Sequence, residues 1–196
     1  VFNNLQISGF PLSFTLTADQ VTFTRNTVQT FSWRAEAFRA TARPWALRRL
    51  TISATDNSVT LSARGSSRNV QIKAAALRMP VELDHTNWPA TIAVRFERPV
   101  LKIPGMSNDI AAASLDLQCT GSRDGQGSIT LEAIDVTSGD ELLQRLGGTV
   151  DLIKAVIDVK GAWSAGPTDR QLDAWRLNGG TVEVRDTRIE FGALKA

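Results

Sequence analysis

Apolar and polar residues alternate with a period of two along most of this chain. Near the start, Phe14 and Leu16 alternate with Thr15 and Thr17. Each such run has one apolar and one polar face, which is typical of antiparallel strands that cover a core on one side. The further runs have apolar members at Phe31, Trp33, Ala35 and Ala37; Leu50, Ile52 and Ala54; Val59 and Leu61; Val70 and Ile72; Ile92, Val94 and Phe96; Leu115, Leu117 and Cys119; and Ile129 and Leu131. The pattern predicts a mainly β fold.

Clusters of turn-forming residues separate these runs about every 10–12 residues, as in a meandering sheet. Turns are expected at Ala18-Asp19-Gln20, Asp56-Asn57-Ser58, Gly65-Ser66-Ser67 and 121–127, and the prolines fall at the ends of runs. We therefore expect a long, curved, antiparallel meandering sheet. A length of 196 residues with 42% apolar residues fits a single β-rich domain over residues 1–196.

The C-terminal part repeats a helix, a glycine pair and a strand. The first copy has Ser138 and Glu141 as a capping box, then Gly147-Gly148; the second has Thr168 and Gln171, then Gly179-Gly180. A glycine pair after a helix supplies the left-handed residue that ends it, whereas a phosphate-binding loop needs its glycines before the helix. The fold is thus expected to be α+β, with two short C-terminal helices that are each followed by Gly-Gly and a strand.

Charge is unevenly distributed although the net charge is only +2. Residues 1–100 carry 12 basic against 6 acidic residues, and residues 101–196 carry 10 against 14. A basic face toward anionic lipid or polysaccharide and dispersed, solvated arginines both explain this. We expect no nucleic-acid partner, since the aromatics near these arginines fit the buried face of a strand. The arginines of the first half are Arg25, Arg34, Arg39, Arg43, Arg48, Arg49, Arg64, Arg68, Arg78, Arg95 and Arg98.

The residues that support most catalytic chemistry are scarce. His85, in an expected loop, is the only histidine, and no nucleophile elbow accompanies it. Cys119 is the only cysteine and is expected to be a small buried hydrophobe. One histidine and one cysteine 34 residues apart do not make a zinc site. We therefore expect no catalytic residues, no metal and no cofactor; two converging carboxylates remain an open route to glycan hydrolysis.

Three segments resemble the bacterial domain-of-unknown-function family 2125. They are Gly9-Phe10-Pro11-Leu12-Ser13-Phe14, the strand Phe31 to Ala40, and the tail Leu177 to Val184 with Arg188 to Gly192. The resemblance implies an envelope protein on the periplasmic side of the inner membrane, held by an N-terminal anchor that this chain lacks. The family is also distantly similar to AsmA-type envelope proteins, whose curved sheets carry lipid along an apolar groove. It supplies no catalytic residues.

Three functions stay open at this point. The first is a non-enzymatic module that binds a lipid or another amphipath on an apolar concave sheet face, because two short helices cannot cover so many one-sided strands. The second is a structural or adaptor protein that binds an envelope partner through strand edges or the arginine-rich half. The third is a carboxylate-based glycan hydrolase. The residues expected to line the groove of the first are Phe14, Leu16, Phe23, Phe31, Trp33, Ile52, Leu61 and Ile72.

Overall fold

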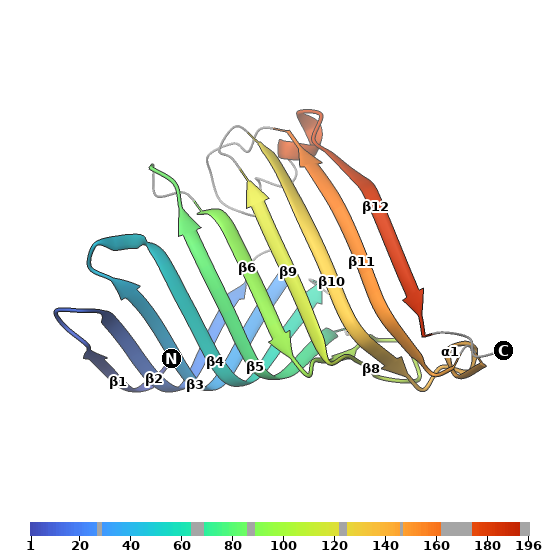
Figure 1. Ribbon diagram of the computed structural model, residues 1–196, viewed down its shortest axis with the longest axis horizontal. Helices are drawn as coiled ribbons and strands as arrows, with labels where there is room; N and C mark the ends of the chain where they lie inside the picture. Colours follow the sequence, from blue (N-terminus) through green and yellow to red (C-terminus); the bar gives the residue numbers. More distant parts are fainter. Residues whose placement is uncertain are drawn as a thin grey trace.

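The computed structural model of the chain describes residues 1–26, 29–63, 69–85, 89–121, 125–145, 147–161 and 174–192. Within these residues the protein is one twelve-stranded antiparallel sheet (Figure 1). Its main path runs β1-β2-β3-β4-β5-β6-β9-β10-β11-β12, so almost every strand pairs with its neighbour in the chain. The predicted mainly β, meandering fold is confirmed.

Four strands in the first half are unusually long. They are β2 (Phe14–Asn26), β3 (Gln29–Arg43), β4 (Ala46–Ala63) and β5 (Asn69–Leu83). The other strands are β1 (Asn3–Ser8), β6 (Pro89–Glu97), β7 (Val100–Lys102), β8 (Ile110–Ala111), β9 (Ser114–Gly121), β10 (Gln126–Ser138), β11 (Thr149–Lys160) and β12 (Thr181–Phe191). The short strands β7 and β8 leave the main path, since β7 pairs with β5 and β8, and β8 pairs with β10.

A line of backbone kinks crosses the sheet and folds it. Gln20, Asp56, Arg98 and Asp135 all have left-handed backbone angles, with φ between 47° and 52°. The ladders skip Gln20 between Asp19 and Val21, and Asp56 between Thr55 and Asn57. Such bulges bend a strand and increase its local twist. We call this line the crease, and in Figure 1 the long strands turn back along it at the lower edge.

The crease divides the sheet into two arms. The front arm contains residues 14–19, 37–43, 46–55 and 76–83 of the long strands, together with β6, β9, β12 and most of β10 and β11. The back arm contains residues 21–26, 29–35, 57–63 and 69–74 with β7 and β8, and it passes behind the front arm in Figure 1. The fold is therefore an open V in cross-section.

The apolar face of the sheet lies on the inside of this V. At the crease, Ala18, Ala35 and Ala54 are at most 4% exposed, whereas Asp19 and Ala37 on the other face are exposed. An alanine reaches such burial only where the sheet folds over it. Two clusters of buried residues form along the crease: Val59, Ala74, Leu77 and Phe96, and Ala133, Val136 and Val150.

The bulges correct the expected turns at Ala18-Asp19-Gln20 and Asp56-Asn57-Ser58. Both segments lie inside single strands. The run 31–37 also changes face at the crease, so the side chains of Ala35 and Ala37 lie on different faces of the sheet. A bulge inserts one residue, so it interrupts a period of two just as a turn does. The expected turn at 65–67 and residues 122–124 lie outside the described residues.

Pro80 also departs from the expectation that prolines end strands, because it lies inside β5 opposite Thr51. The ladder between β5 and β6 is interrupted at residues 79 and 80. The missing N–H of proline therefore falls where no ladder hydrogen bond is made on that side.

The two C-terminal helices are present and short. The helix α1 spans Glu141–Arg145, and a second helical segment includes residues 174–177. Gly148 N–H donates to Leu143 O and Gly180 N–H donates to Trp175 O, each at 2.8 Å, with positive φ at Gly147 and Gly179. This is the same glycine-based C-terminal cap in both copies, and a strand follows each.

The first capping box differs from the prediction. Ser138 is the last residue of β10, and Asp140 O accepts from Gln144 N–H at 3.0 Å, so Asp140 occupies the N-cap position. Ser138 instead supports the turn, since its carbonyl accepts from Gln144 Nε2 at 2.8 Å. The predicted cap of the second helix, at residues 168–171, lies outside the described residues.

Candidate functional site: an apolar groove and an arginine-lined hollow

Apolar side chains form continuous rows across the inner face of the front arm. Each row crosses the sheet from β2 to β12 through nine strands joined by backbone pairing. Neighbouring strands are about 4.8 Å apart, so the eight spacings between nine strands give each row a length of roughly 38 Å. The row at the crease is Ala18, Phe38, Ala54, Leu77, Phe96, Leu115, Ala133, Ile153 and Ile189. The row farthest from it is Phe14, Ala42, Leu50, Val81, Ile92, Cys119, Ile129, Ile157 and Val184.

Exposure of these side chains increases with distance from the crease. On β2, Ala18 is 4% exposed, Leu16 is half-buried and Phe14 is 40% exposed. On the back arm, Val59 is 8% exposed and Leu61 is 39% exposed. The apolar faces therefore meet at the crease and separate away from it, which leaves an open apolar groove.

The total surface area agrees with an open sheet. The chain exposes 13086 Å², whereas a compact monomer of 21.3 kDa exposes about 9,100 Å². Among the described residues, no large side chain is less than 2% exposed. The inner face is thus only partly covered by the protein itself.

The eight predicted groove residues all lie on this inner face. Phe31, Trp33 and Ile72 pack on the buried cluster at Val59 and Leu77. Phe14, Leu16 and Ile52 are on the front arm, and Leu16 and Ile52 share one row through Ala40. Phe23 and Leu61 are on the back arm, where the rings of Phe23 and Phe31 lie 6.1 Å apart.

Sequence reasoning omitted the groove residues that follow Ile72 in the chain. Leu77, Phe96, Leu115 and Leu117 take part in the same apolar surface. Their alternation was visible in the sequence, but assigning them to the same surface as β2–β4 requires the strand order and register. The meander supplies both.

A buried polar pair holds the crease at its deepest point. Asn57 follows the kinked residue Asp56 and is 3% exposed. Its Oδ1 accepts from Trp33 Nε1 at 3.1 Å, and its Nδ2 donates to Ala54 O at 2.9 Å. Both hydrogen-bonding ends of the amide are thereby used, as burial of a polar group requires. The Trp33 ring also contacts Phe38 across the crease, at 5.9 Å between ring centroids.

Cys119 is exposed, which corrects the expectation of a buried residue. It lies on the apolar face, as its parity with Leu117 predicted, but in the row farthest from the crease. A hollow of about 210 Å³ on this face is lined by Cys119, Ile92, Ile129 and Val159 among others. Partial burial among these side chains raises the pKa of the Cys119 thiol above its ordinary value of 9.0, which disfavours the reactive thiolate.

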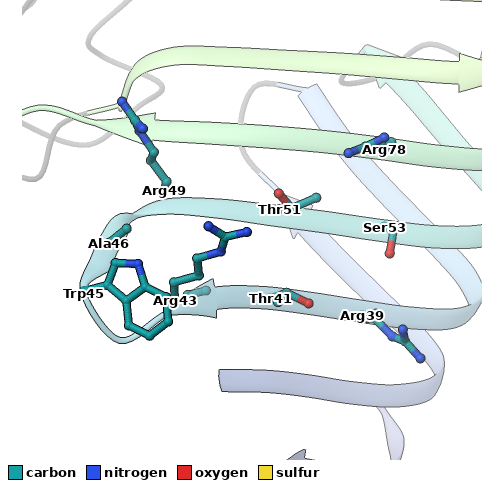
Figure 2. Close-up of a pocket in the computed structure, with 10 residues that line it drawn as sticks. Arg39, Thr41, Arg43, Trp45, Ala46, Arg49, Thr51, Ser53 and Arg78 are labelled. Carbon is teal, nitrogen blue, oxygen red and sulfur yellow. The ribbon is translucent and has the colours of Figure 1, made fainter. Parts of the chain in front are cut away.

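Arginines gather on the opposite, polar face of β3, β4 and β5. Arg39, Arg43, Arg49 and Arg78 line a hollow of about 700 Å³, which Trp45 borders at the β3–β4 turn (Figure 2). Arg39 and Arg78 flank Ser53 in the register of the three strands. The predicted excess of arginine in the first half is therefore partly concentrated at one place, which we call the arginine hollow.

Several charged groups of the other strands are paired with each other. In the part of the chain that the structure describes, ion pairs join Arg95 to Asp116 at 3.7 Å and Lys154 to Glu132 at 3.1 Å. Edge-strand pairs include Lys160 with Glu183 at 3.0 Å. In the arginine hollow only Arg49 has such a partner, Glu82 at 3.1 Å, among the described residues. Within this part of the chain Arg39, Arg43 and Arg78 thus have no ion pair, and Arg39 and Arg78 also line the neighbouring hollow that contains Asp19 and Glu97.

His85 and the carboxylates Asp19 and Glu97 do not form a catalytic arrangement. His85 lies in an exposed turn, where its backbone oxygen accepts from Arg48 at 3.4 Å. One polar-face hollow contains two carboxylates, Asp19 and Glu97, but these lie on β2 and β6 with three strands between them. Four steps of about 4.8 Å separate them by roughly 19 Å, beyond the roughly 5–10 Å of a glycosidase pair.

Two absences concern the described residues. They contain no group of three or more His, Cys, Asp or Glu side chains that could hold a metal ion. None of their helices is long and apolar enough to cross a membrane.

Comparison with known protein families gives a match. A family described as "Uncharacterized protein conserved in bacteria (DUF2125)" matches residues 2–196. No curated protein matches the chain, and no solved structure does.

Proposed function

The chain belongs to the DUF2125 family of uncharacterised bacterial proteins, and we propose that it is a non-enzymatic module that binds a lipid or a similar amphipath in the apolar groove. The observation that carries the proposal is the fall in burial from the crease to the outer rows. A folded chain that leaves an apolar face of this size open gains free energy when an apolar ligand covers it.

The shape of the groove favours a long, thin ligand. Its rows are roughly 38 Å long, and the strand-by-strand register keeps one apolar residue per strand in line along each of the two rows traced above. The polar side chains point to the other face, so the groove offers few hydrogen-bonding partners for a polar ligand. An acyl chain meets both conditions, since its affinity comes from buried area and it needs no hydrogen bonds.

The same proposal includes the cellular setting. We propose that the protein lies on the periplasmic side of the inner membrane, with a membrane anchor outside this chain. We also propose a distant kinship to AsmA-type lipid-carrying proteins. Fractionation of cells that produce the full-length protein, with protease accessibility of this domain in spheroplasts, tests the setting. Resistance to protease in intact spheroplasts, with digestion after lysis, would contradict it.

The groove is tested with two matched pairs of variants. Phe23→Glu and Leu61→Glu place a carboxylate on the apolar face at positions that are about half exposed, so folding should tolerate them. Thr24→Glu and Thr60→Glu place the same charge one residue away, on the polar face. Binding of a fluorescent fatty acid or phospholipid should fall at least tenfold in the first pair, because an acid must be desolvated there. The second pair should bind as the wild type does.

Two independent readouts accompany the variants. Native mass spectrometry after gentle extraction should detect co-purifying lipid. A bound ligand should also slow alkylation of Cys119, which lies in the outer apolar row. A clean apo mass in several preparations, together with no saturable binding of either probe, would refute the proposal.

The edges of the sheet support a second candidate function, the binding of a partner chain by strand addition. The edge strand β12 exposes Val182, Val184 and Ile189, and β1 is exposed along its whole length. Exposed strand edges are templates for pairing with another chain. A partner on this edge should protect β12 amides from hydrogen exchange, and Val182→Lys with Val184→Lys should abolish that protection. Unchanged exchange of β12 with a candidate partner would exclude it.

A further inference from the structure

Two turns at the open end of the front arm carry large apolar side chains that are more than half exposed. Phe10 and Leu12 lie in the β1–β2 turn and are 79% and 73% exposed. Trp45 and Leu47 lie at the β3–β4 turn and are 67% and 56% exposed. Leu12, Trp45 and Leu47 face solvent, and neither the fold nor the groove accounts for their exposure.

The register places the two turns side by side. Phe14, which follows the first turn, pairs with Ala42, which precedes the second. The rings of Phe10 and Phe14 lie 6.2 Å apart, which continues the apolar surface from the turn onto the strand. In Figure 1 both turns lie at the upper ends of their strands, away from the crease. We call this edge, residues 9–13 and 44–47, the rim.

The arginine hollow lies directly behind the rim. Figure 2 shows Trp45 beside Arg43, with Arg39 and Arg78 farther along β3 and β5 toward the crease. Arg39, Arg43 and Arg78 have no carboxylate partner among the ion pairs of the described residues, whereas Arg95 on the next strand has Asp116. Exposed apolar tips backed by arginines without ion pairs in the described chain match the two layers of a bilayer surface, which presents acyl chains beneath anionic phosphates.

We propose that the rim docks onto a bilayer that contains anionic phospholipid, with Trp45 and Leu47 entering the interface and the arginine hollow facing the phosphates. Tryptophan favours the headgroup level of a membrane, since its ring is apolar and its N–H is polar. Guanidinium groups bind phosphate through two parallel hydrogen bonds. The charge complementarity selects anionic over zwitterionic lipid, and this inference does not depend on a ligand in the groove.

Vesicle flotation tests the electrostatic half of the proposal. The protein should float with vesicles of phosphatidylcholine and phosphatidylglycerol in equal amounts, but not with phosphatidylcholine alone. Arg39→Gln with Arg78→Gln should weaken binding about 25-fold, because each basic residue near an anionic surface contributes about fivefold. Binding of the wild type should fall steeply from 0.1 M to 0.5 M salt, because salt screens exposed charges.

The chain supplies a matched control for these two arginines. Arg34 and Lys73 also flank a serine of β4, Ser58, on the polar face, but on the back arm. Arg34→Gln with Lys73→Gln removes the same charge from the same kind of position. This double variant should weaken binding by less than about threefold, because only long-range electrostatic attraction to the membrane is lost. Equal effects of the two double variants would overturn the proposed orientation.

The apolar half is tested at Trp45 and Leu47. Trp45→Ser with Leu47→Ser should reduce binding on the order of tenfold. Met106→Ser, at an exposed apolar residue of the β7–β8 turn, should have no effect. A fluorophore on Trp45→Cys, in a Cys119→Ser background, should shift to the blue with anionic vesicles, and one on Met106→Cys should not.

Several outcomes would overturn the proposal. They are no flotation at 0.1 M salt, equal flotation with zwitterionic vesicles, and tighter binding to heparin or to a single-stranded oligonucleotide than to the vesicles. The last would identify a polyanion other than a membrane as the partner of the arginine hollow. The groove variants Phe23→Glu and Leu61→Glu should retain vesicle binding, so failure of the groove and failure of the rim are distinguishable.

Discussion

The hydrogen bonds of Asn57 should contribute measurably to the stability of the crease. Asn57→Ala removes the acceptor of Trp33 Nε1 and the donor to Ala54 O, at a site that is 3% exposed. An unmet buried polar group costs about 1–3 kcal/mol. The half-buried indole falls at the low end of that range, because water can reach it. We therefore expect a loss of about 2–4 kcal/mol in the free energy of unfolding.

Urea unfolding followed by far-ultraviolet circular dichroism measures this loss, and the melting temperature should fall by roughly 4–16 °C. Trp33→Phe removes the same hydrogen bond from the other side. The two changes combined should therefore be less destabilising than their sum, by about 1 kcal/mol. Gln71→Ala is the control, since its contact to Ser58 is longer, at 3.3 Å, and only part-buried. If Asn57→Ala costs no more than Gln71→Ala, the pair does not hold the crease.

Three further predictions follow from local contacts. Gly180→Ala should destabilise the fold by about 1–3 kcal/mol, because its Cβ would lie 2.3 Å from the Trp175 ring; the same change at Gly121, whose φ is not positive and whose Cβ would come no closer than 3.9 Å to a neighbour, should cost less in the same urea titration. Alkylation of Cys119 by iodoacetamide should reach half its maximal rate above pH 9.0, since burial raises the pKa of its thiol, and a midpoint below that value would contradict the partial burial. The hydrogen bond and charge of Lys160 lower the pKa of Glu183, so this pair supports the folded state above the ordinary carboxyl pKa of 4.5 and loses that support as the pH falls through the lowered value. Glu183→Gln should therefore lower the melting temperature slightly at pH 7 and low salt and leave it unchanged in 1 M salt, and an equal effect in 1 M salt would contradict this reasoning.

The strands and their apolar face could be predicted from the sequence, because alternation is a local property. The crease could not, since a bulge at Asp56 and a turn at Asp56 interrupt the alternation in the same way. The difference is decided by the neighbouring strands, which are kinked at the same level at Gln20 and Arg98. A single kinked strand would lose its pairing, whereas kinks in register bend the whole sheet.

The candidate sites were predictable to different extents. The eight groove residues are on one face because each has the right parity within its own strand. Arg39 and Arg78 both line the arginine hollow although they are 39 positions apart in the sequence. They come near each other because their strands, β3 and β5, both pair with β4. Once a meander is assumed, pairing Arg39 with Ser53 and Ser53 with Arg78 gives this cluster. The two turns of the rim become neighbours by the same rule.

The crease also explains why the apolar face can stay open. Non-glycine residues in the left-handed region are costly, at roughly 1–2 kcal/mol each, so the kinks at Gln20 and Arg98 need compensation from packing. That packing is concentrated where Leu77 and Phe96 are buried, next to the kinks. The outer rows, with Phe14 at 40% exposure, contribute much less to folding. In the proposed function, stability and ligand binding therefore depend on different rows of the same face, so that the outer rows can exchange water for an apolar ligand without unfolding the sheet.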